Sequence, residues 1–122
     1  MREILFKAKR LDNGEWVEGD LLHTRHADVV LISDFKDQLF RCDGNTLCQY
    51  TGLTDKNGQK IWENDIAHIR SSGLSGYGVI KYQNGNLVLV DAKRKRTYSM
   101  YGEWKIRKDG NIFDNPDLLE VE

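Results

Sequence analysis

The stretch QYTGLTDKNGQKIWENDI, residues 49 to 66, decides the fold of this 122-residue chain. Its first part, Thr51-Gly52-Leu53, permits a sharp backbone turn, and the following DKNG at 55 to 58 predicts a polar hairpin or loop. Two large apolar side chains then anchor these bends. The stretch therefore indicates architecture, carried by Tyr50, Gly52, Asp55, Gly58, Ile61, Trp62 and Asp65.

The same turn chemistry recurs along the chain. An Asx residue followed by glycine tolerates the positive φ angles that two-residue hairpins require. Such dipeptides occur at Asn13-Gly14, Asp43-Gly44, Asn57-Gly58, Asn84-Gly85 and Asp109-Gly110. The sequence therefore predicts a chain dominated by β-hairpins.

Apolar residues between these turns alternate with a period of two or form short buried runs, as in strands. The predicted strands are 3 to 10, 15 to 23, 28 to 33, 38 to 42, 65 to 71, 76 to 83, 87 to 92 and 95 to 100. Helix is limited to about one turn after Asn115-Pro116. We expect a mainly β protein with a hairpin lobe at 1–50 packed on a small, partly open SH3-type barrel at 51–122. The alternative is one integrated domain.

Composition restricts the partners. Charged residues make up 30% of the chain and the net charge is -1, so the whole-molecule field favours neither nucleic acid nor an anionic membrane. The start, MREILFKAKR, lacks the apolar core of a secretory signal, and no later run approaches a membrane span. We expect a cytoplasmic protein whose binding, if any, is local.

Three motifs in order resemble the YopX family of small phage and prophage proteins: ILFKAKR at 4 to 10, the stretch at 49 to 66, and GNIFDNPDLL at 110 to 119. The resemblance implies a largely β protein with an SH3-type barrel in its C-terminal part, oligomeric in some members and without an established activity. It adds Gly110, Asn111 and Pro116 to the structural residues.

The chain departs from the family pattern at three places. Trp62 replaces a common tyrosine, and Asn64 stands where glycine is common. Asparagine is the residue after glycine that best tolerates a left-handed backbone, so a tight bend is expected there. Lys108 and Asp109 replace apolar residues before Gly-Asn-Ile, which disfavours regular strand pairing at that point.

The strongest charge feature is the run Lys93, Arg94, Lys95 and Arg96, followed by Tyr98 and, further on, by Tyr101 and Trp104. Cations that hold phosphates and rings that stack on bases are what single-stranded nucleic acid requires. The alternative is a solvated hairpin tip, in which only about half of the run meets one phosphate backbone.

A second candidate is the glycine-rich segment 73 to 78. It lacks the lysine of a P-loop and precedes a strand, so it does not predict a phosphate cradle. We expect a flexible loop bordering a groove, with Tyr77 as its aromatic face.

Catalytic and metal chemistry find little support. His23 and His26 lack a third ligand, and His68 has no sequence partner. In an extended segment the carboxylates of Glu63 and Asp65 share a face, but Asp65 is more simply an acceptor of backbone N–H groups. We expect no metal, no cofactor and no catalytic residue.

The two cysteines, Cys42 and Cys48, lie around a predicted turn where a disulfide is sterically possible. In the cytoplasm, reduced and partly buried thiols are favoured.

These observations favour a non-catalytic, self-associating interaction protein of phage or prophage origin. The aromatic residues suffice for a small core, and a short barrel with an N-terminal hairpin leaves edges that another copy could cover. The alternative is a single-stranded nucleic-acid-binding module that uses residues 93 to 96.

Overall fold

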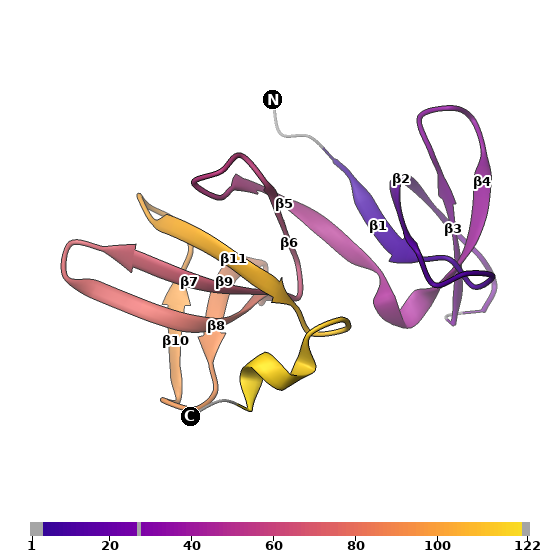
Figure 1. Cartoon of the computed structure of the whole chain (residues 1–122). Helices are drawn as coiled ribbons and strands as arrows, with labels where there is room; N and C mark the ends of the chain where they lie inside the picture. The colour runs from indigo at the N-terminus through magenta and orange to yellow at the C-terminus, as the bar shows by residue number, and fades with distance from the viewer. Residues whose placement is uncertain (1–3, 27, 121–122) are drawn as a thin grey trace. The chain divides into compact units, whose positions relative to one another are not determined.

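The computed structural model describes residues 4–26 and 28–120, and these are mainly β, as predicted (Figure 1). The chain divides into two compact units, Met1–Gly52 and Leu53–Glu122. The division falls within one strand, β5 (Cys48–Thr54). Position 3, the start of the first predicted strand, lies outside the described residues.

In the N-terminal unit, β1 (Phe6–Lys9) pairs antiparallel with β2 (Trp16–His23) and with the start of β5. The sheet continues from β2 through β3 (Val29–Ser33) to β4 (Leu39–Asp43). A 3-10 turn, η1 (Gly44–Thr46), then leads to β5. The unit buries Ala8, Val30, Ile32 and Cys42 in its core.

In the C-terminal unit, the end of β5 and the short strand β6 (Lys60–Trp62) neighbour each other. The following strands are β7 (Asp65–Ser71), β8 (Leu74–Gln83), β9 (Asn86–Asp91), β10 (Arg96–Ser99) and β11 (Lys105–Asn111). A 3-10 turn, η2 (Pro116–Leu119), follows, which matches the predicted helical turn.

These five strands form an antiparallel sheet in the order β10-β9-β8-β7-β11 (Figure 1). The expected SH3-type barrel is not confirmed, because β11 pairs with β7 and the order of the described strands does not return to β10. One face of the sheet packs on the core cluster Ile61, Ala67, Ile69, Ile80, Leu87, Leu89, Met100 and Ile106. Because side chains alternate along a strand, the residues between these point to the opposite face.

The bend at residues 62 to 65 has the geometry expected from its sequence. Asn64 has a φ of 73°, in the left-handed region. Asp65 is fully buried, and its Oδ2 accepts the N–H of Trp62 at 2.7 Å, the backbone role predicted for it. Asp55 Oδ1 likewise accepts the N–H groups of Asn57 and Gln59, each at 2.9 Å, and so closes the DKNG turn.

Three predictions were wrong. Asp43-Gly44 is not a hairpin turn, because Gly44 begins η1 and the strands on either side, β4 and β5, are not neighbours in the sheet. Residues 73 to 78 do not form a flexible loop: a turn at Ser72 and Gly73 leads directly into β8. Asp109-Gly110 is no hairpin turn either, because the register of β11 against β7 shifts between Lys108 and Gly110 and leaves Asp109 in a β-bulge. Strands β5, β6 and β11 were not predicted, since polar residues and glycine interrupt their alternation.

Candidate functional site

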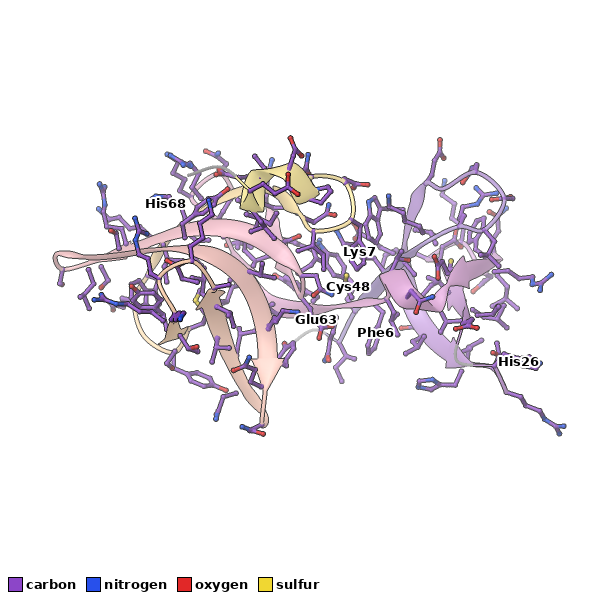
Figure 2. The ribbon with its side chains drawn as sticks, turned by 90° about the horizontal axis from the view of Figure 1, so that it is seen from below. Phe6, Lys7, His26, Cys48, Glu63 and His68 are labelled. Atoms are coloured by element: carbon purple, nitrogen blue, oxygen red, sulfur yellow. The ribbon has the colours of Figure 1, made fainter. Side chains whose placement is uncertain are left out.

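Three polar side chains form a row on the face of the C-terminal sheet opposite its core. Arg107 of β11 lies directly opposite His68 of β7, and His68 lies directly opposite Tyr77 of β8. The His68 and Tyr77 rings are 5.6 Å apart between centroids and tilted by 52°. Figure 2 labels His68, which belongs to β7. The pairing of three adjacent strands therefore brings together residues separated by up to 39 positions in the sequence.

The bulged residue Asp109 joins the ends of this row. Its carboxylate lies 3.0 Å from Nε of Arg107, and its negative charge also acts on the Tyr77 hydroxyl. Burial raises the pKa of the Tyr77 hydroxyl above its ordinary value, and the negative charge and hydrogen bond of Asp109 raise it further. Asp109 therefore links Arg107 and Tyr77 electrostatically at the two ends of the row.

Two hollows flank this row, and both are lined by His68 and Arg107. The first, of about 760 Å³, also includes Arg70, Trp104, Lys105 and the turn residue Lys56. The second, of about 530 Å³, also includes Tyr77, Lys93, Arg94, Asp91, Asp109 and the η2 residues Leu118 and Leu119.

Among the described residues that line the two hollows, six are Lys or Arg and three are Asp. We call the six the cationic face: Lys56, Arg70, Lys93, Arg94, Lys105 and Arg107. The chain as a whole has a net charge of -1, so this face concentrates positive charge that the composition conceals.

The basic run occupies the turn between β9 and β10, with only Arg96 inside a strand. Lys93 and Arg94 line the second hollow, whereas Lys95 and Arg96 line neither. Arg94 folds back on Asp91, which accepts its backbone N–H at 3.1 Å and lies 3.3 Å from its guanidinium. The hairpin thus directs half of the run toward the cationic face.

Of the two aromatic candidates, Tyr77 and Tyr98, only Tyr77 lies on this face. Tyr98 is opposite Leu89 of the core and packs against the core cluster. Its ring meets Trp104 edge-on at 6.0 Å, and its hydroxyl donates to the Ser75 carbonyl at 3.3 Å. Trp104 in turn donates its Nε1 hydrogen to the Ser99 carbonyl at 2.9 Å while lining the first hollow.

The remaining structural residues predicted from the sequence shape the backbone or are buried in the core. Tyr50, Ile61 and Trp62 are buried, whereas Gly52 and Gly58 take positive φ angles. Near the end of the chain, Asn111 Oδ1 accepts the N–H groups of Phe113 and Asp114 at 2.9 Å, and the Asn111 N–H donates to Asn115. A side chain at Gly110 would collide with Asn115, and Pro116 begins η2.

Sequence reasoning considered His68 only as a metal ligand and set it aside, and it gave no indication of Lys56, Arg70, Lys105 or Arg107 as site residues. The available signal was the alternation of polar or cationic residues with apolar ones in β7 and β11. That alternation shows that these side chains share a face of their own strand, but only the strand register shows which of them meet.

The histidines and cysteines of the described residues form no metal centre and no disulfide. Within residues 4–26 and 28–120, no three His, Cys, Asp or Glu side chains form a group suited to a metal ion. His23 and His26 are exposed on the N-terminal unit. Cys42 and Cys48 are buried and donate to the carbonyls of Phe40 and Thr46. Burial raises the pKa of the Cys42 thiol.

Over the part of the chain described, no helix has the length and hydropathy to cross a membrane.

Fold and site together define a small β protein of two units with a cationic, partly aromatic sheet face. The chain belongs to the YopX protein family, which matches residues 5–120 and confirms the resemblance seen in its motifs. Among solved structures it is similar to the crystal structure of protein yopX from Bacillus subtilis, at a TM-score of 0.57 and 16% identity. That similarity covers 97% of this chain and 98% of the other, and at this identity it shows the fold alone. No curated protein matches the chain.

Proposed function

We propose that this YopX-family chain is a non-catalytic binding protein whose cationic face holds a single strand of nucleic acid. One observation carries the proposal: the Arg107–His68–Tyr77 row and the pair Lys93 and Arg94 lie around the same hollow. Cations neutralise phosphates and aromatic rings stack on bases, and a single strand presents both at once.

The charge arrangement supports a strand lying across the sheet. Arg107 and Arg94 each have a carboxylate partner, Asp109 and Asp91, yet their side chains remain 56% and 67% exposed. Such pairs fix the position of a guanidinium while leaving its remaining N–H donors available. Lys105 and Arg70 are also exposed and extend the face toward Trp104.

The test uses two matched double variants of the same hairpin. Lys93→Gln with Arg94→Gln removes two charges from the cationic face, whereas Lys95→Gln with Arg96→Gln removes two charges that line neither hollow. Fluorescence anisotropy with a labelled single-stranded oligonucleotide should show at least a fivefold weaker affinity for the first variant only. Equal losses in both variants would mean that net charge alone drives binding and would overturn the proposed site.

Salt dependence supplies a second measure. For single strands the logarithm of the binding constant falls with the logarithm of salt concentration by about 0.7 per phosphate contact. The Arg107→Gln variant should therefore have a slope smaller by about 0.7 than that of the unchanged protein. An unchanged slope would exclude Arg107 as a phosphate contact.

A second candidate function is self-association, which a different surface supports. On the outer side of the N-terminal sheet, Leu22 of β2 lies opposite Leu31 of β3, with Leu39 of β4 nearby. Leu22 is 46% and Leu39 is 59% exposed, and Phe35 in the adjoining turn is 75% exposed. Exposed apolar side chains gathered on one sheet are typical of a protein interface. We propose a second copy of the chain as the partner.

Sedimentation of the whole protein distinguishes the two candidates. The self-association proposal predicts a discrete multimer at micromolar concentration that Leu22→Ser with Leu39→Ser dissociates. The control is Leu74→Ser, which changes a 58% exposed leucine of the C-terminal unit. A monomer at every concentration, or equal dissociation by the control, would remove this candidate.

Family membership also supports a phage or prophage origin and a place in the bacterial cytoplasm, which we include in the proposal. A gene outside any phage-derived region would contradict the origin. Fractionation of the protein with the cell envelope would contradict the cytoplasmic location.

A further inference from the structure

The second hollow differs from the rest of the cationic face because its floor is apolar. We call it the η2 hollow, after the turn that forms one wall. Val79 of β8 and Val90 of β9 lie directly opposite each other and form the floor, and Leu118 and Leu119 of η2 form the wall. Figure 1 shows η2 in yellow after β11. A phosphate has no apolar surface to contact these side chains, so a ligand that fills the hollow should carry an apolar part as well.

Polar groups surround the floor. Tyr77 lies two residues before Val79 in β8 and therefore on the same side of the strand, so its ring borders the apolar patch. Gly78, between them, contributes only backbone to the lining. Lys93 and Arg94 stand at one rim and Arg107 at another. The hollow thus combines an apolar floor, an aromatic wall and a cationic rim.

These properties match one chemical unit, a nucleotide. A base has flat apolar faces and polar edges, and it carries its phosphate a short distance away on the sugar. The volume of about 530 Å³ is within the range of about 300 to 1,000 Å³ for small-molecule sites. The carboxylates of Asp91 and Asp109 also belong to the lining, where they hold the guanidinium groups of Arg94 and Arg107 in place.

We propose that the η2 hollow receives one unpaired base of a bound strand, with the Tyr77 ring against the base and with Lys93 and Arg94 on its phosphate. This inference rests on the proposed function and deepens it. A base cannot enter the hollow while it is paired in a duplex, so the hollow selects single strands over double strands.

The experiment uses the whole chain and three small probes: adenosine monophosphate, adenosine and inorganic phosphate. Amide shifts in two-dimensional NMR report where each probe binds. We expect the nucleotide to move the amides of Tyr77, Gly78 and Val90 and to bind at least tenfold more tightly than phosphate. If phosphate reproduced all the shifts of the nucleotide, the site would be an anion site only and the inference would be overturned.

A blocking variant tests the hollow itself. Ala92→Trp places a large side chain at an exposed lining position, and Asn86→Trp places the same side chain at an exposed position of β9 outside the lining. We expect Ala92→Trp to lose nucleotide binding at least tenfold and to weaken oligonucleotide binding several-fold, and Asn86→Trp to change neither.

Failure of this inference is distinguishable from failure of the proposed function. If oligonucleotide binds in a salt-sensitive way and Ala92→Trp leaves it unchanged, the cationic face stands and the base site is overturned. If the unchanged protein binds neither oligonucleotide nor nucleotide, both are overturned.

Discussion

His68 and Tyr77 face each other across β7 and β8, with ring centroids 5.6 Å apart. This pair occupies the middle of the cationic face, since His68 lines both hollows and Tyr77 lines the η2 hollow. Neither ring belongs to the core cluster on the other side of the sheet. Two aromatic rings are thus placed where a ligand would meet them, on strands whose backbone is held by pairing on both sides.

Replacement of Tyr77 should separate stacking from hydrogen bonding. Tyr77→Ala removes the ring and should weaken single-stranded oligonucleotide binding by about 1 to 3 kcal/mol, the usual contribution of one stacked base. Tyr77→Phe keeps the ring and should bind nearly as well as the unchanged protein. Fluorescence anisotropy at fixed salt measures both. Equal weakening by the two variants would show that the hydroxyl, and not the ring, matters.

The raised pKa of the Tyr77 hydroxyl predicts that the stability of the protein depends on pH. Because the pKa of Tyr77 is raised in the folded state, the folded protein holds this proton more tightly than the unfolded chain does. The contribution of Tyr77 to the free energy of unfolding is therefore fully present below about pH 10, the ordinary pKa of tyrosine, and is lost as the pH rises through the folded pKa.

Urea unfolding of the unchanged protein and of Tyr77→Phe at several values between pH 8 and pH 11 measures this effect. The difference in unfolding free energy between the two proteins should shrink or change sign as the pH rises, because groups common to both, including the Cys42 thiol, cancel. A constant difference over this range would show that Tyr77 is not perturbed in the folded state.

Features set by a few neighbouring residues could be predicted from the sequence. The positive φ of Asn64, the N–H acceptor role of Asp65 and the helical turn beginning at Pro116 each depend on local backbone geometry. The tight turn at Asn84-Gly85, where both residues have positive φ, belongs to the same class. In these cases the residue type alone restricts the backbone.

The candidate site could not be predicted, because it depends on strand register. His68 gains its partners only when β7 is placed between β8 and β11, and the bulge at Asp109 determines how β11 meets β7. Similarly, nothing local distinguishes Lys93 and Arg94, which line the η2 hollow, from Lys95 and Arg96, which do not. Glycines at 76 and 78 suggested a loop, whereas their role is to let other residues approach the strand.

Asp65 should be the most sensitive polar position of the C-terminal unit. Its Oδ2 accepts the Trp62 N–H at 2.7 Å and lies 3.2 Å from Nζ of Lys108, and the residue is fully buried. Asp65→Ala leaves a buried donor and a largely buried lysine without this carboxylate, so we expect a loss of about 3 to 5 kcal/mol in unfolding free energy.

Asp65→Asn retains an oxygen acceptor for the Trp62 N–H and should lose less. Removal of the exposed Asp12, which pairs with Arg10 on the surface, is the control and should change the unfolding curve little. Urea denaturation compares the three variants. If Asp65→Ala unfolded at the same urea concentration as the control, the buried carboxylate would have no structural role.

Gly78 should be required for its lack of a side chain. A Cβ at this position would collide with the carbonyl oxygen of Val90 on the neighbouring strand, so the backbone of β8 or β9 would have to move. We expect Gly78→Ala to lower the unfolding free energy by about 3 kcal/mol or more, because the clash is with backbone and not with a flexible side chain.

Gly58→Ala is the matched control. Its Cβ would meet open space, and its φ of 81° should cost only about 1 to 2 kcal/mol. Thermal unfolding of both variants measures the loss of stability. Oligonucleotide binding is a second readout, because movement of the backbone at residue 78 also displaces Tyr77. If Gly78→Ala were no more destabilising than Gly58→Ala, the close approach of β9 would not explain the need for glycine at residue 78.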